Sequence, residues 1–327
     1  MLQLREKKYI LVMVVLLILS IFILILQSSK SCDKNETYKK KADKILVILT
    51  GDFSSEMEKV RKIYKNYDTI EFNIPLDVSP KNWNELAKYI FKMYNEYDAF
   101  VILHNSETIT YTASALSFML ENLDKTVVLG SNGILTMDLA TNYNIPEVVV
   151  YDGERIIRGC RSKNINNAIN SPNYPYLGKN ENKIKINSDK ILSRPTEPLK
   201  LLPIDTNKKI LLFKLFPGVD SKYLLSVLKQ QKVDGIIFES YNGFTTTDSK
   251  FLKIIGDSIK NGIYVVIVSQ NMGNITNRSL EDIGVIYGGD MTCEAMLAKL
   301  YIILSNVPNL NNNMTKDLIN ISMRGEI

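Results

Sequence analysis

The stretch YDAFVILHNSETITYTASALSFMLENL, residues 97–123, decides the fold of this 327-residue chain. It opens with a short apolar run, AFVIL, which is typical of a strand buried on both faces of a sheet. A polar turn follows at residues 104–108, and the segment TASALSFMLENL then predicts a helix. A buried strand that leads through a turn into a helix is the repeating unit of a parallel α/β sheet.

The same alternation continues on both sides of this unit. Further buried strands are predicted at KILVILTG, TIEFNIP, TVVLG and EVVVYD, residues 44–51, 69–75, 126–130 and 147–152. Helices are predicted at SSEMEKVRKIYKN and SPKNWNELAKYIFKMYNEY, residues 54–66 and 79–97. We therefore predict the α/β fold class, with a doubly wound parallel sheet in an N-terminal domain at residues 44–185.

A second, smaller α/β domain is predicted at residues 207–327. Strands KKILLFKLFP, VDGIIFES and IYVVIVSQ alternate there with helical segments, and CEAMLAKLYIILSN, residues 293–306, predicts a helix near the end. Residues 186–206 contain three prolines and no strong periodicity, so we predict that they form the linker between the domains.

The N-terminus carries the clearest non-globular feature of the chain. After a basic flank at residues 1–8, residues 9–27 read YILVMVVLLILSIFILILQ, a run long enough to span a hydrocarbon core of about 30 Å as one helix. We predict a single-pass anchor in a membrane of the secretory pathway, followed by a polar tether at residues 28–43. A signal peptide cleaved near SSKSC is the alternative, and basic residues on both sides leave the orientation unresolved.

Composition argues against several classes of function. The net charge of +5 comes from 40 basic and 35 acidic residues that are scattered along the chain, which is unlike a nucleic-acid-binding surface. Cys32, Cys160 and Cys293 form no CxxC pair, and His104 is the only histidine. This inventory does not supply the usual zinc ligands, so we predict no metal and no cofactor.

Ligands in open parallel sheets bind beyond the carboxyl ends of the strands. This rule selects the residues that follow each predicted strand: Thr50 to Phe53, His104 to Thr108, Gly130 to Asn132, and Glu239 to Gly243. Three of these four segments belong to the first domain, so we expect the site there.

The strand ends resemble those of the two-domain bacterial L-asparaginases. ILVILTG is similar to the start of the first family signature, and residues 97–123 are similar to the second, in which a strand leads into a His-Gly-Thr-Asp-Thr turn and a helix. Later family segments follow in the same order, namely IPEVVVYDGERIIRGCRSK, SPNYPYLGK, FKLFPGVD, DGIIFESYNGF and YGGDMTCEAMLAKLYIILSN. The resemblance runs from about Lys44 to about Asn306.

The resemblance implies a Rossmann-like N-terminal domain that holds the active site, a smaller C-terminal domain, and assembly into a homo-dimer or tetramer. It also implies hydrolysis of a small amide, asparagine or glutamine, by a threonine hydroxyl that forms an acyl-enzyme. A second threonine, an aspartate and a lysine transfer protons in that family. A hydroxyl needs such help because it is a weak nucleophile while it keeps its proton.

Carried over residue by residue, the resemblance places the candidate catalytic residues at Ser106, Glu107 and Lys163, which stand for the second threonine, the aspartate and the lysine. Candidate substrate-binding residues are Thr50 and Ser131, at two strand ends, and Asp77, which lies where the family contacts the substrate amine. The loop RGCRSK before Lys163 is one residue shorter than the family pattern.

The first signature departs most from the family. Phe53 stands at the position of the attacking threonine, and a phenylalanine has no nucleophilic atom. The segments at 52–78 and 132–140 are also shorter than in the family, through evolutionary loss or mis-assigned splice boundaries. Two functions remain open: an L-asparaginase-like amidohydrolase that uses a displaced serine, Ser54 or Ser55, and a catalytically inactive member that serves as a binding or assembly module.

Overall fold

The computed structural model describes residues 38–72, 74, 77–241, 249–271 and 278–327. The predicted anchor at residues 9–27 lies outside these ranges, as does most of the predicted tether. Within the described ranges, none of the helices combines the length and the apolar character needed to cross a bilayer.

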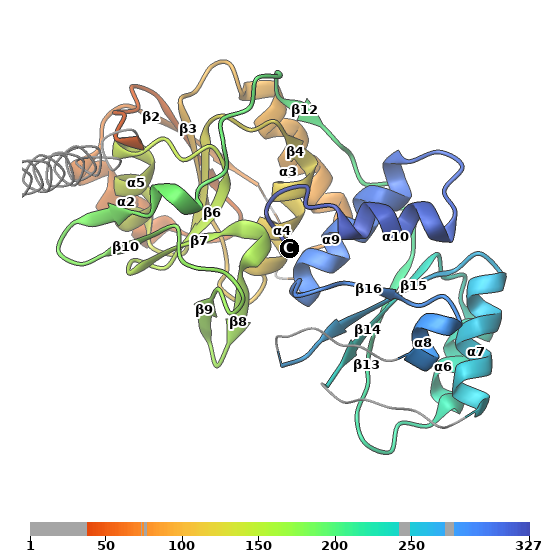
Figure 1. Ribbon diagram of the computed structural model, residues 1–327. Helices are drawn as coiled ribbons and strands as arrows, with labels where there is room; N and C mark the ends of the chain where they lie inside the picture. Colours follow the sequence, from red (N-terminus) through yellow and green to blue (C-terminus); the bar gives the residue numbers. More distant parts are fainter. Residues whose placement is uncertain (1–37, 73, 75–76, 242–248, 272–277) are drawn as a thin grey trace, which may run out of the picture.

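The N-terminal domain is built on an eight-stranded sheet (Figure 1). In their order across the sheet, the strands are β11 (Ile184–Ile186), β10 (Gly178–Asn180), β7 (Arg155–Arg158), β6 (Val148–Tyr151), β5 (Thr126–Gly130), β3 (Ala99–Leu103), β1 (Ile45–Leu49) and β2 (Tyr67–Glu71). The five strands from β6 to β2 run parallel, as predicted. The predicted domain boundary after residue 185 falls inside β11.

The other three strands are antiparallel, which the sequence did not predict. The chain reverses directly after β6 because Gly153 adopts a positive φ of 99° and the Asp152 carboxylate accepts hydrogen bonds from the backbone N–H groups of Glu154 and Arg155. A tight turn of this kind joins antiparallel strands, whereas a parallel return needs a long crossover.

Helices cover both faces of this sheet (Figure 1). They are α2 (Ser54–Ile63), α3 (Pro80–Met93), α4 (Ile109–Met119) and α5 (Gly133–Asn142). Side chains of β1 alternate between the faces, as the two-residue period of a strand requires. Leu46 and Ile48 belong to the core with α3 and α4, whereas Ile45, Val47 and Leu49 belong to the core with α2 and α5.

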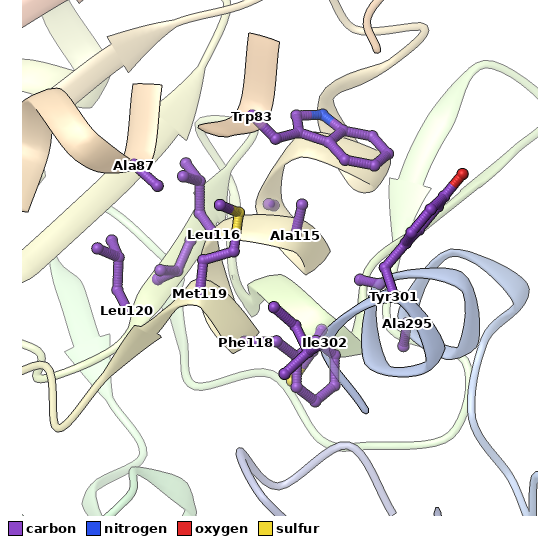
Figure 2. Close-up of a cluster of buried hydrophobic side chains, with 14 of the residues drawn as sticks. Trp83, Ala87, Ala115, Leu116, Phe118, Met119, Leu120, Ala295, Tyr301 and Ile302 are labelled. Carbon is purple, nitrogen blue, oxygen red and sulfur yellow. The ribbon is translucent and has the colours of Figure 1, made fainter. Parts of the chain in front are cut away.

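Helix α4 lies at the centre of the molecule. Ten of its eleven residues are buried, and it packs against α3 on one side and against α9 (Cys293–Asn306) of the C-terminal domain on the other (Figure 2). The helix ends at Met119, four residues earlier than predicted. Leu120 and Glu121 form a short strand, β4 (Leu120–Glu121), that pairs with β12 (Lys200–Leu201), so the linker returns to the N-terminal domain.

The C-terminal domain has a four-stranded, fully parallel sheet in the order β13 (Ile210–Lys214), β14 (Gly235–Ser240), β15 (Tyr264–Ser269) and β16 (Ile286–Tyr287). Helices α6 (Ser221–Gln230), α7 (Ser249–Lys260) and α8 (Arg278–Asp282) flank one face, and α9 covers the other. Helix α9 has the predicted bounds, and the Thr292 hydroxyl caps it by accepting from the N–H of Ala295.

After α10 (Asn312–Asn320), the last seven residues return to the N-terminal domain, and the C-terminus lies beside α4 (Figure 1). The carbonyl of Gly325 accepts hydrogen bonds from the guanidinium groups of Arg158 and Arg161. Arg324 donates to the carbonyl of Ser117 at the end of α4. The tail therefore fastens the two domains together.

A buried ion pair holds the tail in place. The Lys299 ammonium lies 2.6 Å from a carboxylate oxygen of Glu326, both side chains are fully buried, and the ammonium also donates to the carbonyls of Ile319 and Ile321. Burial alone raises the pKa of Glu326, but the charge of Lys299 and the hydrogen bonds from Lys299, Met323 and Arg324 together outweigh it, and the net shift is downward.

Candidate active site

Three neighbouring strands of the N-terminal sheet end side by side. Thr50 follows β1, His104 follows β3 and Ser131 follows β5, and the pairing continues past the strands through the hydrogen bonds from Thr50 N to Leu103 O (3.1 Å) and from His104 N to Gly130 O (3.0 Å). Thr50 and His104 are buried, whereas Ser131 is exposed.

His104 is held in a chain of hydrogen bonds. The Thr50 hydroxyl donates to the carbonyl of Leu103 (2.9 Å), so it accepts from Nδ1–H of His104 (2.5 Å). On the other side, Trp83 Nε1–H donates to the Thr112 hydroxyl, which in turn donates to Nε2 of His104 (2.9 Å). This assignment makes the imidazole neutral, and it gives the Thr50 hydroxyl two partners within the protein.

Burial lowers the pKa of His104 to about 4. Because His104 is the only histidine, we expect one set of imidazole NMR signals, with a titration midpoint near pH 4 in the folded chain and near 6.5 in urea. The unfolded chain takes up the proton first, so stability falls as the pH drops from 6.5 to 4. A folded-state midpoint above pH 6 would contradict this environment.

The turn after β3 carries two of the candidate catalytic residues. The Asn105 side chain accepts a hydrogen bond from the N–H of Glu107 (2.9 Å), and the Ser106 and Glu107 side chains are exposed to solvent. The N-cap of α4 is Thr108, two residues later, so Ser106 does not cap the helix. The Ser106 hydroxyl is therefore accessible to a ligand.

The turn after β1 has a different form. Phe53 is the N-cap of α2 and packs with the core beneath that helix. Ser54 already lies in the helix, and its hydroxyl donates to the Asp52 carboxylate (2.7 Å), while Ser55 is exposed. The chain thus enters α2 directly at the position that the resemblance assigns to the attacking threonine.

Helices α2 and α5 close the space beside this turn. The Glu56 carboxylate accepts a hydrogen bond from the N–H of Gly133, the first residue of α5 (2.9 Å). A Cβ atom on Gly133 would lie 2.9 Å from the Val60 side chain, so the two helices are in close contact. This contact joins the two segments, 52–78 and 132–140, that the sequence predicts to be shorter than in the family.

Lys163 opens β8 (Lys163–Ile165), which forms a hairpin with β9 (Ala168–Asn170). Asn166 and Asn167 at the tip both have positive φ, as a tight hairpin turn requires. The side-chain amide of Asn164 donates to the carbonyl of Ser106 (3.4 Å). The structure therefore brings the lysine-bearing hairpin against the turn of Ser106 and Glu107.

The Lys163 ammonium points to the C-terminal domain. It lies 3.3 Å from the Glu239 carboxylate at the end of β14, and both side chains are largely buried. Lys214 lies 3.9 Å from the same carboxylate. Among the described residues, Lys163 has no ion pair with Glu107. Glu239 was selected by its strand-end position, but its pairing with Lys163 was not predicted.

Three further groups surround this pair. Glu294, in the first turn of α9, is 6% exposed, and among the described residues its Oε2 has no hydrogen-bond partner. Burial raises its pKa, while its own backbone N–H and the Lys163 charge act in the opposite direction. Burial also raises the pKa values of Cys293 and Tyr111. Sequence reasoning missed Glu294, whose only signal is a carboxylate in the first turn of a largely apolar helix.

The remaining candidate lies apart from this cluster. Asp77 is exposed and precedes Ser79, the N-cap of α3. No hydrogen bond or ion pair joins it to the strand ends within the part of the chain that the structure describes. In the same part of the chain, no three histidine, cysteine or acidic side chains gather as a metal site would require.

Comparison with known proteins identifies the family. Residues 35–134 match the family model "Asparaginase, N-terminal", and residues 209–314 match "Glutaminase/Asparaginase C-terminal domain". The chain is 34% identical over 282 residues to L-asparaginase 1 of Escherichia coli (strain K12), covering 77% of this chain and 81% of that protein. It is 29% identical over 276 residues to the human 60 kDa lysophospholipase, covering 77% of this chain and 48% of that protein.

A solved structure gives the same result. The crystal structure of L-asparaginase I from Vibrio cholerae O1 biovar eltor str. N16961 superposes with a TM-score of 0.78 at 29% identity, covering 87% of this chain and 99% of that one. The resemblance stated from the sequence is confirmed, and so is the α/β architecture with a smaller C-terminal domain. This chain belongs to the asparaginase family.

Proposed function

We propose that the chain is an L-asparaginase-like amidohydrolase that converts L-asparagine, or L-glutamine, into the corresponding acid and ammonia. The observation that carries the proposal is the contact between the Lys163 hairpin and the Ser106 turn, made by Asn164. It holds the hairpin that carries Lys163 beside the turn that carries the Ser106 hydroxyl and the Glu107 carboxylate. These groups match the roles that an amide hydrolase with a hydroxyl nucleophile needs.

Ser106 is the best-placed nucleophile of the candidates. Phe53 has no nucleophilic atom, and the Ser54 hydroxyl is bound to Asp52 inside α2. In the proposed reaction, Ser106 Oγ attacks the amide carbon, its proton passes by way of Glu107 to the leaving nitrogen, and ammonia departs. Water then hydrolyses the ester to release the acid. The Lys163 ammonium stabilises the negative charge that develops on the amide oxygen.

We expect Ser106→Ala to lower kcat/KM for asparagine by about a hundredfold, since it removes the attacking hydroxyl. Ammonia release by the purified full chain in detergent measures this. Ser55→Ala, at an exposed position in α2, is the matched control and should retain activity. If Ser55→Ala abolishes turnover and Ser106→Ala does not, the displaced serine is the nucleophile. A folded chain without turnover at millimolar asparagine or glutamine rejects the proposal.

The second candidate function is a non-catalytic binding or assembly module. Phe53 at the N-cap of α2 favours it, because a helix begins where the family has its nucleophile loop. Phe53→Thr distinguishes the candidates. If the native chain shows no turnover and the Phe53→Thr chain does, the native site is inactive because it lacks a nucleophile. Clear turnover by the native chain rules out a purely non-catalytic function.

We further propose that residues 9–27 anchor the protein in a membrane of the secretory pathway and that the chain assembles into homo-dimers or tetramers. The length and apolar character of residues 9–27 support the anchor, and the family resemblance supports assembly. Recovery in the carbonate-insoluble membrane fraction tests the anchor. Light scattering of the detergent-solubilised chain, corrected for bound detergent, tests assembly.

A further inference from the structure

We propose that Glu239 of the C-terminal domain, and not Glu107 of the neighbouring turn, is the positioning residue that holds Lys163. The Lys163–Glu239 contact then joins the two domains within one chain. The functional part of this inference rests on the proposed amidohydrolase activity, whereas the contact itself is independent of it.

The burial of the pair makes the contact energetically relevant. The Lys163 and Glu239 side chains are 14% and 15% exposed, and their charged atoms lie 3.3 Å apart. Fully exposed pairs contribute little because water and salt screen them. A pair that is mostly removed from water is screened much less, and loss of one partner leaves the other charge poorly solvated. The exposed Lys62–Glu58 pair on α2, at 70% and 72% exposure, provides the contrast within the same chain.

Glu239 is fixed on a rigid framework. It lies in β14, between β13 and β15, and its carbonyl accepts hydrogen bonds from Leu215 N (2.9 Å) and from the side-chain amide of Gln270 (2.7 Å). The same Gln270 amide also donates to the carbonyl of Leu215 (2.8 Å). The carboxylate is therefore presented from a backbone position that three strands determine.

Lys163 is fixed from the other side. Two residues earlier, the buried guanidinium of Arg161 forms an ion pair with Asp290 of the C-terminal domain at 2.8 Å. Between them, the buried Ser162 hydroxyl donates to the carbonyl of Gly159 (2.7 Å). Two ion pairs from one short loop thus reach the C-terminal domain, and Lys163 stays directed at Glu239 rather than at Glu107.

Charged and ionisable groups surround the Lys163–Glu239 pair on several sides. The carboxyl groups of Glu239 and Glu294 face Lys163 from β14 and α9, Lys214 faces Glu239 from β13, and the thiol of Cys293 and the phenol of Tyr111 complete the surroundings. The ion pair with Glu239 therefore engages the Lys163 ammonium, and Glu107 is left as the carboxylate of the turn that can accept the Ser106 proton.

A double-mutant cycle tests the contact without any substrate. Lys163→Met, Glu239→Gln and the double variant are compared by urea unfolding of the full chain in detergent. We expect coupling of about fivefold or more in the unfolding constant, and less than about twofold for the matched cycle of Lys62→Met and Glu58→Gln. Additive effects at Lys163 and Glu239 overturn the proposal.

A chemical readout separates positioning from mere structural support. Acetylation of Lys163 by acetic anhydride at neutral pH, quantified by mass spectrometry against the exposed Lys88, should rise several-fold in Glu239→Gln. It should stay near the native rate in Glu107→Gln. The reverse pattern, with faster labelling in Glu107→Gln only, makes Glu107 the counter-ion and overturns the proposal.

Measurements of turnover test the proposed function separately from the contact. If the native chain turns over asparagine, Glu239→Gln should lower kcat about tenfold with little change in KM, and Glu239→Asp should recover part of it. An unchanged kcat in Glu239→Gln overturns the positioning role. If no variant shows turnover while the cycle shows coupling, the amidohydrolase proposal fails and the Glu239–Lys163 contact stands.

Discussion

Lys299→Met is expected to destabilise the protein by about 4 kcal/mol, because it leaves the Glu326 carboxylate buried without its cation. The carboxylate would keep hydrogen bonds from the N–H groups of Met323 and Arg324, but these do not neutralise its charge. The carbonyls of Ile319 and Ile321 would also lose their donor. Urea unfolding of the full chain in detergent measures the loss.

The double variant Lys299→Met with Glu326→Gln is the control for this effect. It removes both charges, so it should be clearly more stable than Lys299→Met alone. Acid should act on the native chain in the same direction. Glu326 has a lowered pKa in the folded state, so its contribution is complete above the ordinary value near 4.5 and is lost as the pH falls below it. A double variant as unstable as the single one would contradict the ion-pair explanation.

Gly325→Ala is expected to destabilise the protein by about 4 kcal/mol through two effects. The residue has a φ of 75°, where an added Cβ strains the backbone. That Cβ would also clash with Nη1 of Arg158. The guanidinium would have to move away from Glu147, with which it forms a buried ion pair at 2.6 Å.

Gly262→Ala separates these two contributions. Gly262 has a φ of 83°, but a Cβ there meets no atom within 4 Å, so only the backbone term of about 1 kcal/mol applies. The difference between the two variants, measured by urea unfolding, gives the effect of displacing Arg158. Equal losses in Gly325→Ala and Gly262→Ala would show that the guanidinium moves without consequence.

Short stretches of sequence predicted those strands and helices whose pattern of apolar and capping residues lies within the stretch itself. The continuous apolar runs of β1 and β3 identify buried strands, and the Thr292 cap and apolar run of α9 define that helix. The early end of α4 was missed because it depends on β12, which lies about eighty residues later in the chain. The short helix α5 was missed because it follows β5 almost directly and lacks a strong polar face.

The sequence predicted where the candidate site lies, but not which of its side chains contact one another. The strand-end rule selected Thr50, His104, Ser131 and Glu239 because each lies at the carboxyl end of a buried strand. It could not show that the Thr50 hydroxyl faces His104 or that Glu239 meets Lys163. These contacts depend on the pairing of β1 with β3 and on how the two domains dock, and neither is encoded in a short window of sequence.

The position of α4 has a consequence for how the chain folds. The helix contributes to the core of the first sheet and, through α9, to the contact with the second. Without α9, its apolar side chains would face water, and without α4 the apolar side of α9 would do the same (Figure 2). The two domains are therefore one cooperative unit, in which neither sheet reaches its native free-energy minimum before the other has docked.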